Sequence, residues 1–204
     1  MSLDLLHLFL ELFTLGSFVA TGFWAGRRFG TDGLWLYGFF FALGALRENY
    51  VALERVLYGY ADFTFMFGRA PLVGAVIWGF SIAAAIAAAE AIRREPFRID
   101  RVPSAAELLL VALCLVALAG FFEPFLKLVG MARWEEGTAK VLDVPKIALV
   151  GYPTFAVVSL ACGGWILGRY GGARARLSAF ALATPVLALG HAWALGRLKD
   201  ALGW

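Results

Sequence analysis

The chain has 204 residues, of which 61% are hydrophobic and 16% are charged, and its net charge is +3. Soluble domains carry about 25% charged residues, so this composition excludes an ordinary soluble protein. Repeated apolar runs of the roughly 20 residues needed to cross a bilayer predict instead an all-α, polytopic membrane protein with one domain, residues 1–204. Six spans are expected, at residues 3–25, 33–57, 71–92, 104–128, 146–168 and 175–196.

The first expected span begins with MSLDLLHLFLELF, which lacks the basic start and the small-residue cleavage site of a signal peptide. We therefore expect a retained helix. His7 and Glu11 are four residues apart, so they share one helical face and are expected to pair there.

The second expected span contains Glu48. At about 1.5 Å per residue, a helix that begins at residue 33 carries Glu48 below the surface of the hydrocarbon layer. A carboxylate at that depth costs several kcal/mol unless it is paired, hydrated or protonated. A protonated Glu48 would be a proton donor beside an apolar substrate. The alternative is a structural ion pair with Arg47, Arg55 or another helix.

Two connections, LYGYADFTFMFGRAP after the second span and MARWEEGTAKVLDVP after the fourth, differ from ordinary solvent loops. Irregular backbone at membrane depth is tolerated where it lines a cavity, so we expect an apolar mouth whose aromatic faces stabilise a cation. An interfacial aromatic belt is the alternative. The expected mouth residues are Tyr58, Tyr60, Phe63, Phe65, Phe67 and Trp134.

The fourth expected span starts with a capping box, in which Ser104 lies three residues before Glu107. Near its other end stands Glu123, followed by Pro124. Because a residue before proline is disfavoured in helical geometry, we expect a helix end or kink that turns Glu123 toward a cavity. Lys127, four residues on, is its expected neutralising partner.

The sequence also predicts an internal two-helix repeat, at about residues 33–92 and 104–168. In each copy an acid ends an apolar run, a proline follows 22 or 23 residues later, and an aromatic residue stands seven beyond the proline. Two spans per copy imply the same orientation, with an axis along the membrane normal. Such an axis would bring Arg69 and Asp143, each two residues before its proline, together as an ion pair. The matched residues are Glu48, Pro71 and Trp78, then Glu123, Pro145 and Tyr152.

Three short loops read GRRFGTDG, RREPFRIDR and GRYGGARAR and hold nine of the eighteen Lys and Arg residues. By the positive-inside rule these loops face the cytoplasm, which predicts an integral protein of a prokaryotic cytoplasmic membrane. No zinc, serine-nucleophile, phosphate-loop or dinucleotide motif occurs in the sequence. We therefore expect no metal site, no cofactor and no nucleic-acid partner.

The spaced pattern resembles the carotenoid hydratases, integral membrane enzymes that add water to the terminal double bond of linear carotenoids. The resembling features are Glu48, Tyr58-Gly59-Tyr60, Pro71-Leu72 and Trp78, then Glu123-Pro124, Trp134, Asp143-Val144-Pro145 and Gly151-Tyr152. They cover about a third of the chain. The chain departs from the family's pattern in four places: Glu123 replaces an aspartate, Arg69 and Asp143 replace glycines, and Ala148 replaces an asparagine.

The resemblance implies hydration of a terminal alkene in a long isoprenoid or carotenoid, with membrane lipid as surroundings. Cyclisation is one alternative, and a small carrier or lipid-binding bundle without catalysis is another. Substrate chain length, product and assembly into a homo-oligomer stay open. Expected catalytic residues are Glu48, Glu123 and Asp143. Expected substrate-binding residues are Asn49, Tyr58, Tyr60, Asp62, Arg69, Trp78, Lys127, Trp134 and Tyr152.

Overall fold

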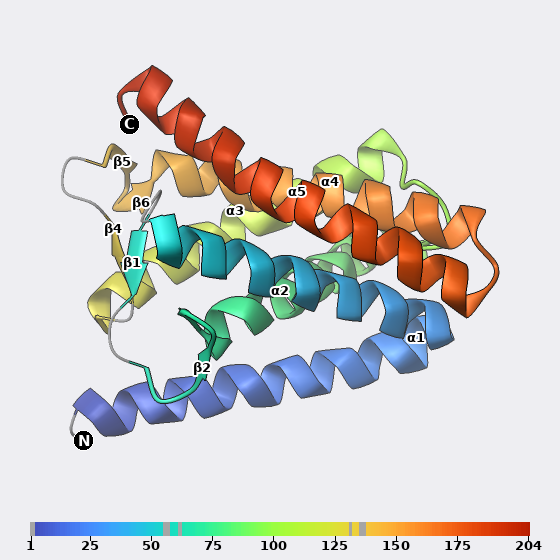
Figure 1. Ribbon diagram of the computed structural model, residues 1–204, viewed down its shortest axis with the longest axis horizontal. Coiled ribbons are helices and arrows are strands. Elements are labelled where there is room, and N and C mark those ends of the chain that lie inside the picture. Colours follow the sequence, from blue (N-terminus) through green and yellow to red (C-terminus); the bar gives the residue numbers. More distant parts are fainter. Residues whose placement is uncertain (1–2, 55–57, 61–62, 131, 135–137) are drawn as a thin grey trace.

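A computed structural model describes residues 3–54, 58–60, 63–130, 132–134 and 138–204. In these residues the fold is all-α, with five helices that are each long and apolar enough to cross a membrane, as an integral membrane protein requires. Figure 1 shows the helices lying lengthwise beside one another. They are α1 (Leu3–Glu54), α2 (Leu72–Arg93), α3 (Ala105–Leu128), α4 (Lys146–Arg169) and α5 (Ala173–Leu202).

Helix α1 consists of two arms that join at Gly30, where φ is 65° and ψ is −148°. Only glycine adopts this conformation without strain, so the chain reverses there (Figure 1). The N-terminal arm (residues 3–29) packs against the C-terminal arm (residues 31–54): the Tyr37 hydroxyl donates a hydrogen bond of 2.7 Å to the Phe18 carbonyl. A Cβ at Gly22 would lie 2.9 Å from the Tyr37 ring, so the close approach of the arms depends on a glycine there.

One end of the molecule, here called the hairpin end, carries three short antiparallel strand pairs and both described ends of the chain (Figure 1). Each of two β-hairpins lies immediately before a helix that begins after a proline, at Pro71 and Pro145. A third strand pair joins the connection after α1 to the connection after α3, with Tyr58 opposite Trp134. The pairs are β1 (Tyr58–Tyr60) with β4 (Ala132–Trp134), β2 (Met66–Phe67) with β3 (Ala70–Pro71), and β5 (Lys140–Val141) with β6 (Val144–Pro145).

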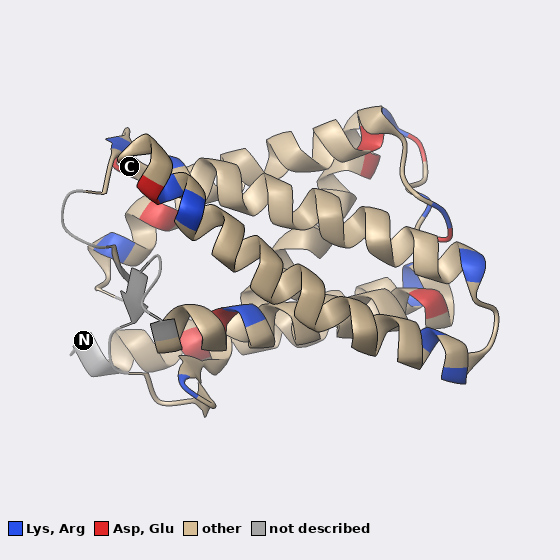
Figure 2. Cartoon of the chain, turned by 45° about the horizontal axis from the view of Figure 1, so that its top comes forward, with Lys and Arg blue, Asp and Glu red and all other residues tan. Residues whose placement is uncertain are grey.

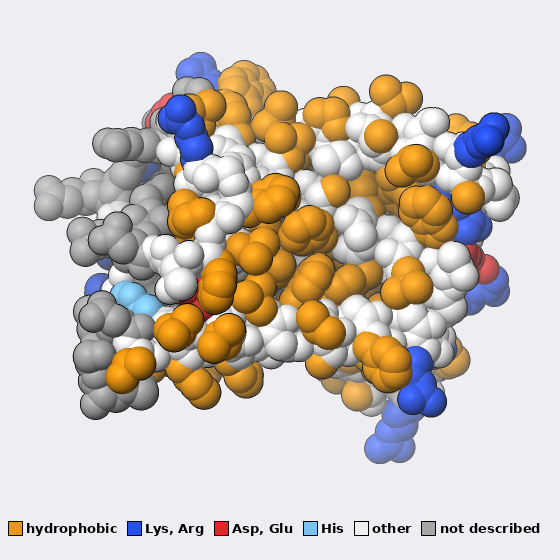
Figure 3. Space-filling view, turned by 60° about the horizontal axis from the view of Figure 1, so that its bottom comes forward, with side chains coloured by type: hydrophobic (Ala, Val, Ile, Leu, Met, Phe, Trp, Pro, Cys, Tyr) orange, Lys and Arg blue, Asp and Glu red, His pale blue; other side chains and the backbone are white. Residues whose placement is uncertain are grey.

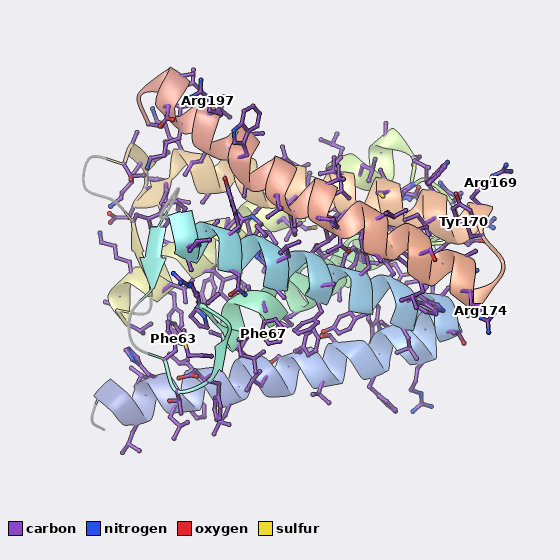
Figure 4. The ribbon with its side chains drawn as sticks, in the orientation of Figure 1. Phe63, Phe67, Arg169, Tyr170, Arg174 and Arg197 are labelled. Atoms are coloured by element: carbon purple, nitrogen blue, oxygen red, sulfur yellow. The ribbon has the colours of Figure 1, made fainter. Side chains whose placement is uncertain are left out.

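The opposite end, here called the arginine-rich end, holds the Gly30 bend and the connections 94–104 and 170–172. Arg28 of α1 pairs with Glu90 of α2, and Arg176 of α5 pairs with Asp32 of α1, so ion pairs join these helices at this end. Figure 2 shows charged residues concentrated towards the two ends of the molecule, and Figure 4 labels Arg169, Tyr170 and Arg174 at the arginine-rich end. The predicted capping box is confirmed, because Ser104 accepts a hydrogen bond from the Glu107 amide and Glu107 accepts one from the Ser104 amide.

The main hydrophobic core lies between the C-terminal arm of α1 and helices α2, α3, α4 and α5. Its fully buried members include Leu43, Ile82, Leu115 and Phe155. Helix α3 packs on both α2 and α4, and its outer face, like that of the N-terminal arm, exposes apolar side chains. Figure 3 shows hydrophobic side chains across the face that it brings forward, with basic residues towards the ends.

The predicted pairing of His7 with Glu11 is wrong. The His7 Nε2 lies 2.6 Å from the Val129 carbonyl oxygen, beyond the end of α3. Glu11 is fully buried and accepts hydrogen bonds from the amides of Thr64 and Phe65, both at 2.9 Å. These backbone groups belong to a connection 53 residues away, so helical spacing alone could not identify them.

Candidate functional site

A cavity of about 380 Å³ lies towards the hairpin end, between both arms of α1 and helices α2, α3 and α4. Its walls are mostly aliphatic and aromatic, but two carboxylates and one guanidinium group reach it among the described residues. These charged groups belong to Glu48, Glu123 and Arg47. The cavity is therefore an apolar chamber with a few convergent polar groups, the usual form of a small-molecule site.

Glu48 enters the cavity from the C-terminal arm of α1 and is 1% exposed. It forms an ion pair with the buried Arg47, and its Oε1 accepts a 2.7 Å hydrogen bond from Trp78 Nε1. The Arg47 guanidinium also lies 4.7 Å from the centre of the Trp78 ring. An indole N–H and a guanidinium only donate hydrogen bonds, so both partners suit an ionised Glu48. The ion pair with Arg47 is the structural alternative that the sequence left open.

Glu123 enters the cavity from α3 and is 5% exposed. Its Oε2 accepts a 2.7 Å hydrogen bond from Trp134 Nε1, and its Oε1 accepts a 2.8 Å hydrogen bond from the Tyr152 hydroxyl. A phenol can also accept a hydrogen bond. The Tyr152 hydroxyl can therefore also accept a hydrogen bond from a protonated Glu123 carboxyl, which the Trp134 indole cannot do.

Glu123 lines the cavity, as expected, but Pro124 does not end the helix, because α3 continues to Leu128 with the proline inside it. A second expectation about Glu123 is wrong. Lys127 does not neutralise Glu123, because its Nζ bonds Asp143 Oδ1 at 2.9 Å. The carboxyl group of Glu123 is held by an indole and a phenol, which are neutral groups.

The two acids belong to one network of side chains. The ring centroids of Trp78 and Tyr152 are 5.1 Å apart, so the hydrogen-bond partner of Glu48 contacts the hydrogen-bond partner of Glu123. The ring of Phe155 lies 4.5 Å from Trp78 and supports it from the core. The network thus joins the Glu48–Trp78 pair to the Glu123–Trp134 pair.

The two acids of the network share one basic neighbour among the described lining residues. Among the described residues that line the cavity, Arg47 is the one cation, beside two carboxyl groups. The position that corresponds to Arg47 before Glu123 is Phe122, which also lines the cavity. Two acids in similar surroundings are therefore distinguished by their neighbours, a guanidinium for Glu48 and a phenyl ring for Glu123.

Asp143 does not line the cavity. It lies in the turn between β5 and β6 with a φ of 63°, and its side chain is 66% exposed. The hydrogen bond from Lys127 lowers the pKa of the Asp143 carboxyl below its ordinary value. In the described part of the chain no ion pair joins Asp143 to Arg69, so the predicted pair across the site is wrong.

Asn49 stabilises a hairpin and does not line the cavity. Its Oδ1 accepts a 2.7 Å hydrogen bond from the Arg69 amide, and its Nδ2 donates one of 2.9 Å to the Phe67 carbonyl. A Cβ at Gly68 would lie 2.3 Å from the Asn49 Oδ1, so this contact requires a glycine in the turn. Arg69 contributes its backbone amide to this contact.

The other expected residues form three groups. Some line the cavity, two lie away from it, and the rest have side chains outside the described residues. Trp78, Trp134, Tyr152 and Phe63 line the cavity, whereas Phe65 and Phe67 do not. Figure 4 labels Phe63 and Phe67 in the connection beside the N-terminal arm. The backbones of Tyr58 and Tyr60 belong to β1, but their side chains and the whole of Asp62 lie outside the described residues.

Sequence reasoning gave Arg47 only a structural role and missed the phenylalanines that line the cavity. The phenylalanine signal was visible in FFEPF, residues 121–125, where three aromatic rings surround Glu123 and Pro124. No group of three or more His, Cys, Asp or Glu residues that could hold a metal is found in the described ranges. The missed lining residues are Phe13, Phe80, Phe121, Phe122 and Phe125.

Comparison of the chain with protein-family models, with curated proteins and with solved structures found no match.

Proposed function

We propose that the protein is a membrane-embedded enzyme that hydrates the terminal alkene of a linear carotenoid or similar long isoprenoid. The observation that carries this proposal is the pair of buried carboxyl groups in one apolar, aromatic cavity, each with different partners. Hydration needs a proton donor, a stabiliser of positive charge and no cofactor. The cavity offers the first two in Glu123 and in the ionised Glu48 with its aromatic neighbours.

The reaction begins when the carboxyl O–H of Glu123 gives its proton to the less substituted carbon of a trisubstituted alkene. The π electrons form the new C–H bond, and a tertiary cation remains on the other carbon. Water adds its oxygen lone pair to this cation and forms the C–O bond. The resulting oxonium returns one proton to Glu123, so the net change is alkene plus water giving a tertiary alcohol.

The surrounding side chains favour the cation over the neutral alkene. A desolvated aromatic face stabilises a cation by up to about 2 kcal/mol, and Trp78 and Tyr152 present such faces beside the acids. The Glu48 carboxylate adds preorganised negative charge. Because Glu48 is paired with the Arg47 guanidinium, we assign it the role of stabilising the cation and assign the proton transfer to Glu123.

We propose further that the chain crosses the membrane six times and contains a two-helix repeat. The first idea is supported by the Gly30 bend, which divides α1 into two arms. The second is supported by matched contacts 74 residues apart: the Leu72 amide bonds the Phe65 carbonyl, and the Lys146 amide bonds the Ala139 carbonyl. The positive-inside rule then directs the arginine-rich end to the cytoplasm, and water reaches the site from the hairpin end.

The direct test is turnover by the purified protein in lipid vesicles. The probe is lycopene, a linear carotenoid with a trisubstituted alkene at each end, incubated in ¹⁸O-labelled water. The expected product has gained one water and carries ¹⁸O. Asp143→Asn is the matched control, because it removes a carboxylate outside the cavity. A cyclised isomer of unchanged mass, or no conversion at all, would overturn the hydration proposal.

A further inference from the structure

The cavity wall between the N-terminal arm of α1 and the end of α3 is also part of the outer surface. Phe13 on the arm and Phe121 on α3 both line the cavity, yet they are 62% and 68% exposed. Side chains that contact both the cavity and the outside mark a lateral opening. We call this region, formed by residues 10–17 of the arm and 121–125 of α3, the seam.

Polar contacts hold the N-terminal arm near both limits of the seam. Towards the hairpin end, His7 lies 2.6 Å from the Val129 carbonyl, and Glu11 accepts the Thr64 and Phe65 amides. Towards the arginine-rich end, Tyr37 holds the carbonyl of Phe18 at 2.7 Å. Among the described residues 12–17 of the arm, no side-chain hydrogen bond reaches α3. The arm is thus fixed at its ends and can separate from α3 between them.

Aromatic rings line the seam on its α3 side. Phe121 and Phe125 stack with centroids 6.2 Å apart, and Phe122 contacts Phe80 of α2 at 6.4 Å. The outer surface on both sides is apolar, with Val19 on the arm and Leu113 on α3 exposed. An exposed apolar surface of this kind on a membrane-spanning helix faces lipid. The seam therefore connects the carboxyl groups with the hydrocarbon interior of the bilayer.

We infer that the seam admits a linear, acyclic polyisoprenoid chain sideways from the bilayer, with its terminal alkene leading toward Glu123. This inference deepens the proposed function and rests on it, because the proposed reaction fixes which end of the isoprenoid enters first. A cavity of about 380 Å³ is near the small end of ligand pockets, which span about 300–1,000 Å³. A long chain does not fit inside as a whole, so its remaining length lies in the seam and in the surrounding lipid.

The probe for this inference is a C20 polyprenol, geranylgeraniol, with a photoreactive diazirine at its hydroxyl end, in lipid vesicles. If the alkene end leads, the diazirine lies near the seam and labels residues 10–17 and 121–125. Ser17→Trp fills the seam and is expected to lower labelling at least about fivefold, because a well-packed wall cannot accommodate the larger ring. Val19→Trp is the matched control, since Val19 is exposed on the same arm and does not line the cavity.

Phe121→Ala gives a second, opposite readout. It removes a ring from the outer edge of the seam and is expected to increase labelling of the N-terminal arm. Equal labelling of the seam and of exposed α5 residues such as Leu182, or no effect of Ser17→Trp, would overturn lateral access. Labelling does not require turnover, so a wild-type protein that hydrates lycopene without seam labelling refutes only the inference. Seam labelling without hydration refutes only the proposed function.

Discussion

Each half of the cavity places a buried acid beside an aromatic hydrogen-bond donor, and the residue that precedes the acid differs between the halves. Glu48 bonds Trp78, and Glu123 bonds Tyr152, at positions 74 or 75 residues apart along the chain. Arg47 precedes the first acid and Phe122 precedes the second. Because buried charges require a paired charge and buried neutral acids do not, we propose that this difference assigns the charge-stabilising role to Glu48 and the proton-donating role to Glu123.

The largest expected effect comes from removing the proton donor. Glu123→Gln keeps the size and the hydrogen-bond acceptor of the side chain but cannot donate an acidic proton. Hydration of lycopene in vesicles should fall by about 10²–10⁴-fold, the usual contribution of a positioned acid. Glu48→Gln should cost less, because it removes a stabilising charge and leaves the donor in place. Equal activities of Glu123→Gln and wild type would contradict this division of roles.

The second expected effect concerns stability and tests the ion pair. Arg47→Leu leaves Glu48 buried without its cation, and breaking a buried pair in this way costs about 3–5 kcal/mol. The Arg47→Leu/Glu48→Gln double variant removes both charges and should recover most of that loss. The free energy of unfolding in detergent, measured by denaturant titration, checks both values. If the double variant is no more stable than Arg47→Leu, the charge pairing is not the cause.

A smaller effect is expected at the contacts that hold the N-terminal arm. Glu11→Ala removes the buried carboxylate that accepts hydrogen bonds from the Thr64 and Phe65 amides. Unsatisfied donors cost about 1–3 kcal/mol when buried, and because these two hydrogen bonds are partly buried a loss near the lower figure is expected in the same denaturant titration. Thr14→Ala is the control, because the Thr14 hydroxyl bonds only the Leu10 carbonyl of its own helix among the described contacts. Equal losses for the two variants would show that Glu11 does not hold the connection.

The smallest effect is expected at Asp143, outside the cavity. Its pair with Lys127 lowers the pKa of the carboxyl below its ordinary value of 3.8. Any stabilisation from this pair is therefore present above that pH and disappears as the pH falls through the folded pKa. Because the pair is exposed and screened by solvent, Asp143→Asn should leave both hydration at neutral pH and the unfolding midpoint unchanged. A large loss of hydration would restore Asp143 as a catalytic residue.

Helix positions could be predicted from the sequence because long apolar runs are a strong local signal. The spans expected at 71–92, 104–128 and 146–168 differ from α2, α3 and α4 by one residue at most at either end. The strand pairs were not predicted, since each strand has only two or three residues. Six crossings and the repeat remain predictions, because α1 is continuous apart from the bend at Gly30.

The acids of the site were also accessible from sequence, because a glutamate within an apolar run is conspicuous. Their partners were harder to predict. Lys127 is four residues from Glu123 but bonds Asp143, sixteen residues away, and Glu11 is four residues from His7 but bonds a distant connection. Helical spacing identifies which residues can meet, whereas the tertiary fold decides which contact is made.

The division between the two acids can be measured directly by infrared difference spectroscopy of the protein in vesicles at neutral pH. A protonated carboxyl group in an apolar cavity has a C=O stretching band that a carboxylate lacks. This band is expected in wild type and in Glu48→Gln, and it should disappear in Glu123→Gln. A band that disappears in Glu48→Gln and persists in Glu123→Gln would contradict the assignment of Glu123 as the proton donor.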